Sequence, residues 1–137
     1  MATYQKYNCF VEDVAEKKHN LASDVLKVAL TNTAPLATHA VLADIGEIAA
    51  GNGYTAGGNQ ALQSSSSQTA GTYALSLSDP ATWVASGGQV GPFRYAVLHN
   101  ETAGGLLIGA WDYGSTITLN DGETFRVDLS ATVLTLS

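Results

Sequence analysis

The second half of the chain alternates apolar and polar side chains with a period of two, and this pattern constrains the fold more than any other feature. In residues 72–78, Tyr73, Leu75 and Leu77 share one face. The pattern recurs as Phe93, Tyr95 and Val97 in residues 91–100, and as Phe125, Val127 and Leu129 in residues 123–130. A period of two is typical of strands with one face in a core.

Turn-forming residues separate these strands. They are Asp79-Pro80, Gly87-Gly88, Gly104-Gly105 and Asn120-Asp121-Gly122. Short strands spaced by such turns favour a sandwich, jelly roll or barrel. The length of 137 residues suits one domain with its own core. We therefore predict a single all-β domain over residues 1–137, built from antiparallel strands as a sandwich, jelly roll or barrel.

The first half is less regular. Residues 24–31 read as a strand, and residues 4–14 read as a strand or a strand followed by a turn. Residues 40–50 have the apolar spacing of a short helix, although Gly46 weakens that prediction. Residues 51–72 are rich in Gly, Ser and Asn and predict a long surface loop, with an extended piece near 61–63 and a flexible serine tract at 64–67.

The charge balance excludes several partner classes. The chain has 6 basic and 12 acidic residues, and four of its lysines fall within residues 1–30. A nucleic-acid or anionic-membrane surface needs clustered Lys and Arg, so we predict neither partner. No apolar run approaches the roughly 20 residues of a membrane span, and the first ten residues lack the apolar region of a secretory signal. We therefore expect synthesis in a cytoplasm.

One glycine-rich stretch resembles a nucleotide-binding motif only loosely. Residues 51–56 fit G-x-G-x-x-A, but that motif works between a strand and a helix, and here a polar loop follows. The simpler interpretation is a turn whose glycines supply positive φ angles, with Tyr54 anchoring the loop to the body.

No constellation of catalytic or metal-binding residues is recognisable. The three histidines, His19, His39 and His99, are far apart in sequence, and the single Cys9 fits a half-buried small apolar residue. The carboxylates that could pair for glycoside hydrolysis have the positions of turn residues; they are Asp44 with Glu47, Asp112, and Asp121 with Glu123. We predict a protein that is not an enzyme and holds no metal or cofactor.

Four aromatic residues offer a different kind of site. Trp83, Trp111, Tyr95 and Tyr113 could form a platform for a sugar ring. Aromatic side chains of this kind more often belong to a core or to a contact between subunits. The sequence leaves both interpretations open.

Long stretches of the chain resemble small structural proteins of tailed bacteriophages. The resemblance covers residues 44–58 (DIGEIAAGNGYTAGG), 91–100 (GPFRYAVLHN) and 111–125 (WDYGSTITLNDGETF), and extends to the opening YQKYNCFVEDVAEKKHNL and DVLKVALTNTAP. Among such proteins, the size and all-β composition are most similar to head decoration, or capsid cement, proteins. The resemblance is one of whole sequence and carries over no active-site residue.

This resemblance implies an antiparallel, jelly-roll-like β-sandwich, and it also implies a role. A decoration protein sits on the capsid exterior as a homo-oligomer, a dimer or trimer, and bridges subunits of the major capsid protein. Residues 1–20 are the predicted partner-contacting arm, and Gly51–Gly71 is a second candidate. The predicted interface residues are Lys6, Lys17, Lys18, Tyr54, Trp83 and Trp111. The alternatives are a tail, neck or baseplate protein of the same virion, or a carbohydrate-binding virion module.

Overall fold

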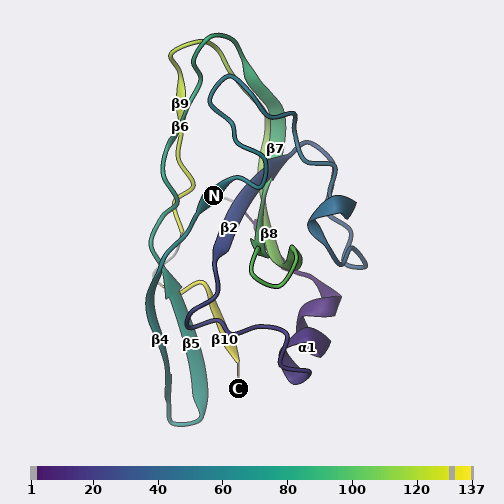
Figure 1. The fold of residues 1–137 in the computed structure, drawn as a ribbon, viewed down its shortest axis with the longest axis vertical. Coiled ribbons are helices and arrows are strands. Elements are labelled where there is room, and N and C mark those ends of the chain that lie inside the picture. Colours follow the sequence, from purple (N-terminus) through teal and green to yellow (C-terminus); the bar gives the residue numbers. More distant parts are fainter. Residues whose placement is uncertain (1–2, 130–131, 137) are drawn as a thin grey trace.

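The computed structural model describes residues 3–129 and 132–136 of the chain (Figure 1). Its strands are β1 (Thr3–Lys6), β2 (Leu26–Thr31), β3 (Asn59–Gln60), β4 (Gln63–Thr69), β5 (Thr72–Leu77), β6 (Trp83–Val84), β7 (Val90–Asn100), β8 (Leu106–Leu119), β9 (Thr124–Phe125) and β10 (Leu134–Leu136). The helical elements are α1 (Asn8–Ala15) and the 3₁₀ turn η1 (Leu42–Asp44). The helices of the described residues are too short or too polar to span a bilayer.

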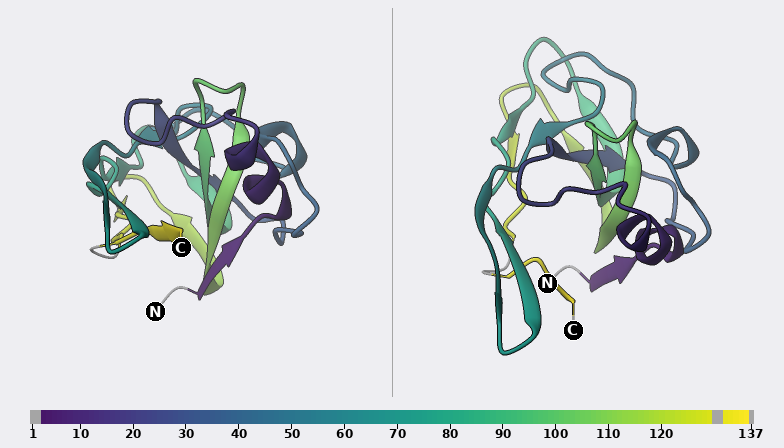
Figure 2. Two further views of the ribbon diagram at one scale, coloured as in Figure 1. Left: turned by 90° about the horizontal axis from the view of Figure 1, so that it is seen from below. Right: turned by 60° about the horizontal axis from the view of Figure 1, so that its bottom comes forward.

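The strands form antiparallel sheets, which confirms the predicted all-β sandwich. One sheet has the order β1-β8-β7-β2-β3, a second has the order β10-β5-β4, and β6 pairs with β9. Figure 2 shows β7 and β8 between the β4–β5 hairpin and α1. The turn at residues 120–122 is present, but it leads into β9, which pairs with β6 and not with β8.

The main core lies between the two larger sheets. Its largest fully buried side chains include Trp83, Phe10, Phe93 and Leu75. The predicted inward positions Leu26, Val28 and Leu30 of β2, and Leu75 and Leu77 of β5, belong to this cluster. Burying such side chains is the main source of stability for a sandwich of this size.

The outer face of the five-stranded sheet carries a second, smaller core. It contains Tyr7, Ala29, Ile45, Val97, Leu107 and Ala110, so the middle of the sheet is buried on both faces. The prediction that Phe93 and Val97 share a face is wrong, because Phe93 belongs to the main core and Val97 to the outer one. The pairing of β7 with β8 shifts register between Phe93 and Tyr95, and such a bulge reverses the alternation.

The N-terminal segment is not a free arm in the described residues. β1 pairs with β8 along Thr3–Lys6, and Tyr7 and Phe10 are buried. Residues 4–14 were predicted as a strand or as a strand followed by a turn; the strand ends at Lys6, and helix α1 follows from Asn8. Phe10 and Val14 lie one helical turn apart, so α1 places both against the core.

Two other local predictions need correction. The short helix predicted near residues 40–50 is reduced to the single 3₁₀ turn η1, next to which the Asp44 carboxylate accepts hydrogen bonds from the backbone N–H groups of Ala40 and Val41. The serine tract is not a flexible loop but the middle of strand β4, which pairs with β5. The polar composition of β4 does not predict a strand. Pairing with the neighbouring strand β5 holds it in that conformation.

Candidate partner-binding surface

An apolar groove of about 440 Å³ lies where α1, β1 and β10 meet. Its lining residues are mostly apolar; they are Tyr4, Lys6, Phe10, Val11, Val14, Ala15, Val133, Leu134, Thr135 and Leu136. Val11 is 57% exposed and Tyr4 is 38% exposed. Exposed apolar side chains gathered around a groove are characteristic of a surface that a partner covers.

Local structure explains how the groove forms. β1 holds Tyr4 beside Trp111, with ring centroids 5.2 Å apart. α1 turns Phe10 inward, which leaves Val11 on the solvent side of the same helix. β10 pairs with β5 and brings Leu136, from the other end of the chain, to the same groove.

The three lysines predicted to contact a partner lie in different surroundings. All three are exposed, and Lys6 lines the groove beside α1. Lys17 lines a neighbouring pocket of about 370 Å³, which shares Leu136 with the groove. Lys18 forms ion pairs within its own segment, with Asp13 at 3.4 Å and Glu16 at 3.1 Å. Only Lys6 and Lys17 therefore border the apolar surface.

Two predicted interface residues belong to the interior. Tyr54 is 3% exposed and Trp83 is 1% exposed, and their rings stack with centroids 6.5 Å apart. Their side chains cannot meet a partner in the folded chain, so the interface prediction is corrected for both. The prediction that Tyr54 anchors its loop is confirmed, because the backbone N–H of Leu30 donates to its hydroxyl at 3.0 Å.

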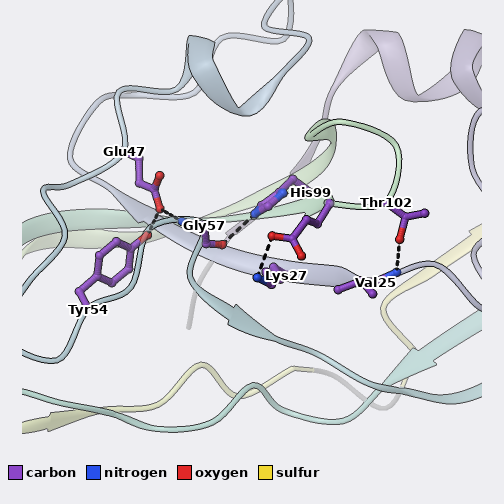
Figure 3. Close-up of polar contacts among 8 residues, drawn as sticks. Val25, Lys27, Glu47, Tyr54, Gly57, His99 and Thr102 are labelled. Carbon is purple, nitrogen blue, oxygen red and sulfur yellow. Dashed lines mark hydrogen bonds and ion pairs between the residues drawn. The ribbon is translucent and has the colours of Figure 1, made fainter.

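A polar cluster beneath this loop has the residue types of an active site (Figure 3). The Glu47 carboxylate accepts hydrogen bonds from the Tyr54 hydroxyl and the Gly57 backbone N–H. His99 Nε2 lies 2.8 Å from the Gly57 carbonyl oxygen. On the solvent side, Lys27 pairs with Glu101 at 2.8 Å. The His99 contact ties residues 47–58 to β7, and the bond from Leu30 to Tyr54 ties them to β2.

The geometry of the cluster supports a structural role. His99 is 1% exposed and lines neither the groove nor the pockets beside Lys17 and Trp111. Because a carbonyl oxygen only accepts hydrogen bonds, Nε2 carries the proton, and Nδ1 is buried without a partner. Burial lowers the pKa of His99 and raises that of Tyr54. A substrate has no route to these groups through the described pockets.

The candidate catalytic carboxylates each have a local task. The Asp121 side chain accepts from the Gly87 backbone N–H at 3.1 Å, and Glu123 accepts from that of Asn120 at 2.7 Å. Asp112 forms a two-bond ion pair with Arg94, whose guanidinium lowers the pKa of that carboxyl. Asp121 and Glu123 stabilise a turn, as their sequence positions predicted, whereas Asp112 lies within strand β8 and not at a strand end.

The remaining reactive residues do not assemble a metal or nucleophile site. Among the described residues, no group of three or more His, Cys, Asp or Glu side chains could hold a metal ion. Cys9 is half-buried, and burial together with Asp13 raises the pKa of its thiol. A raised pKa disfavours the thiolate, which is the nucleophilic form.

Two of the four predicted platform aromatics line the same open pocket. Trp111 and Tyr95 border a pocket of about 260 Å³ with Asp112, Gln5, Ala34, Pro35 and Ala110. Trp83 is buried, and Tyr113 packs edge-on against Phe125 at 5.3 Å. The platform is therefore reduced to Trp111 and Tyr95.

Residues 1–20, the predicted partner-contacting arm, contain both β1 and α1, but the contribution of β10 to the groove was not anticipated. Val11 and Val14 fall where a strand, or a strand followed by a turn, was expected, so the sequence did not predict that a helix would bring them to one surface. Leu134 and Leu136 lie more than a hundred residues away in the chain, and only the pairing of β10 with β5 brings them near α1. No protein-family model, curated protein or solved structure matches the chain.

Proposed function

We propose that this chain is a non-enzymatic bacteriophage virion protein that decorates the capsid exterior and bridges subunits of the major capsid protein. The observation that carries the proposal is the apolar groove between α1, β1 and β10. The whole-sequence resemblance to capsid decoration proteins gives the partner. The protein is made in the host cytoplasm and acts as a homo-oligomer.

The groove suits binding to a fixed surface. An extended or helical segment of the capsid protein would cover Val11, Tyr4 and Leu136, and removing apolar area from water contributes about 25 cal/mol per Å². Lys6 in the groove and Lys17 in the adjoining pocket favour an acidic residue beside that apolar segment. The affinity of one such contact is modest. A homo-oligomer presents several contacts to the same shell, and the high effective concentration after the first contact raises the overall affinity.

A single substitution on α1 tests the groove. Val11→Glu places a charge among apolar groove residues without disturbing the core, because Val11 is 57% exposed. Leu36→Glu is the matched control, since Leu36 is 56% exposed and lies outside the groove. Purified shells of the major capsid protein from the same virion are mixed with each protein, and shell-bound chain is measured after sedimentation.

We expect Val11→Glu to weaken the apparent affinity for shells at least about tenfold, a loss of about 1.4 kcal/mol in binding free energy, and Leu36→Glu to bind as the original chain does. Equal binding of all three proteins would contradict the groove assignment. Purified tails serve as the second binding target. Binding to tails and not to shells would replace the capsid proposal with the tail, neck or baseplate alternative.

The second candidate function is carbohydrate binding at the Trp111 pocket. The observation in its favour is that an indole, the Tyr95 ring and the Asp112 carboxylate border one opening. Aromatic faces with a nearby polar group suit a sugar ring. Titrating the chain with host-surface oligosaccharides while monitoring tryptophan fluorescence tests this function, and an unchanged spectrum at millimolar sugar would remove it.

A further inference from the structure

Strand β4 is the longest edge strand among the described residues. It has 7 residues and stands last in the order β10-β5-β4. The other sheet edges are shorter, with 4 residues in β1, 3 in β10 and 2 in β3. In Figure 1 the β4–β5 hairpin extends away from the rest of the molecule, with β4 on its outer side. Its outer edge is therefore open to another strand.

The hairpin turn identifies which backbone groups point outward. Ala70 and Gly71 both have positive φ, at 51° and 86°, which is the two-residue type I′ turn. In such a hairpin the flanking pair, Thr69 and Thr72, exchanges hydrogen bonds, and the bonded pairs then alternate. Ser67 and Ser65 consequently bond to β5. Ser66 and Gln68 direct their N–H and C=O groups away from it.

This edge lacks the features that usually protect a free strand. Natural sheets protect their edges with Lys, Pro or a covering segment. β4 has neither residue, and its only irregularity is the register shift near Ser64, at the base of the hairpin. Residues 48–78 contain no charged side chain, although the chain as a whole has a net charge of −6. Two copies that meet here avoid placing acids opposite one another.

We propose that β4 pairs with β4 of a second copy of this chain, antiparallel across a two-fold axis. The two registers that keep Ser66 and Gln68 bonded are centred on Ser66 and on Ser67, and both place only uncharged side chains opposite each other. The two three-stranded sheets then join into one. A two-fold contact uses the same surface on both copies and closes at a dimer. The proposal specifies the homo-oligomer of the proposed function but does not depend on the capsid.

Sedimentation of the purified full chain tests the pairing, without any shell present. We expect a concentration-dependent mass of twice 14.2 kDa. Ser67→Lys puts two ammonium groups opposite or diagonal across the axis and should weaken dimerisation at least about tenfold. Ser86→Lys, at an exposed serine outside the hairpin, is the control with the same charge change and should leave the dimer intact.

Amide hydrogen exchange identifies the pairing strand. In the dimer, the N–H groups of Ser66 and Gln68 should be protected, and dilution or Ser67→Lys should release them. Ser65 and Ser67 bond to β5 and should stay protected in both states. A monomer at all concentrations, a dimer that tolerates Ser67→Lys, or a dimer with rapidly exchanging Ser66 and Gln68 would each overturn the proposal. None of these outcomes would change the shell-binding result for the groove.

Discussion

Asn100 is fully buried, and its side chain shows how single polar residues hold the segments of this fold together. Its Nδ2 group donates to the Asp24 carboxylate at 2.7 Å and lies 2.9 Å from His19 Nδ1. Its Oδ1 atom accepts from the Ala103 N–H at 3.1 Å. The neighbouring His99 holds the Gly57 carbonyl in the same way. Because buried polar groups need partners, these side chains fix the loops around β7.

The buried histidines predict how stability depends on pH. Burial is the main cause that lowers the pKa of both His99 and His19 in the folded chain. In the unfolded chain they bind a proton near pH 6.5, so below that pH the unfolded state binds more protons. The contribution of the two histidines to stability is complete above about pH 6.5. It is lost as the pH falls toward the lowered pKa values that they have in the folded chain.

Urea unfolding between pH 8 and pH 5 measures this dependence. We expect the free energy of unfolding to fall across the window below pH 6.5. His99→Gln keeps a donor for the Gly57 carbonyl but has no titration, so its curve should be flatter. The double variant His19→Gln, His99→Gln should be flatter still. A slope in the single variant equal to that of the original chain would contradict the burial argument for His99.

At the scale of elements, alternation predicted the strands better than their pairing. Leu26, Val28 and Leu30 fill the core as expected, because β2 has no register shift against β7. In β7 register shifts on both sides of Phe93, and another between Leu98 and His99, interrupt the alternation. A bulge depends on the partner strand, so the sequence of one strand cannot reveal it.

α1, β4 and the groove could not be predicted for the same reason, because each depends on contacts with other elements of the fold. Phe10 and Val14 have helical spacing, but the short apolar segment was also compatible with a strand. The serines of β4 have a loop composition, and pairing with β5 decides their conformation. The groove needs α1 and β10 together, so it could not be predicted without the fold. The prediction that Tyr54 anchors its loop succeeded, because glycines around one aromatic residue already indicate a packed turn.

The crossing of residues 54–60 over β2 predicts an unequal cost for two glycine substitutions. Both Gly58 and Gly104 have positive φ, at 81° and 78°. A Cβ atom on Gly58 would lie 1.7 Å from the Val28 carbonyl oxygen, whereas one on Gly104 would meet nothing within 4 Å. Gly58→Ala therefore adds a backbone clash to the conformational strain that both substitutions share.

We expect Gly104→Ala to lower the free energy of unfolding by about 1 kcal/mol and Gly58→Ala by about 3 kcal/mol or more. Urea denaturation of both variants at pH 7.5 gives the comparison. Similar losses would mean that the loop can move away from β2 without a loss of free energy. The close packing of Gly58 would then contribute nothing to the free energy of unfolding.

At the scale of the whole molecule, the two proposed surfaces use different residues. The groove is formed by α1, β1 and β10, and the self-association edge is β4. β5 lies between β10 and β4 in one sheet, so both surfaces belong to the same rigid unit. A dimer through β4 would therefore present two grooves in a fixed arrangement, and two fixed sites can bind a repeating shell together.

This arrangement predicts how the two substitutions combine. Ser67→Lys leaves the groove intact but gives a monomer, so shell binding should persist with affinity reduced about a hundredfold, within the range by which bivalency exceeds a single contact. Val11→Glu should stay dimeric and lose shell binding through both grooves. Titrating shells with each protein and with the double variant measures the apparent Kd. If Ser67→Lys binds shells as tightly as the original chain, each copy acts alone, and the dimer contributes nothing to bridging.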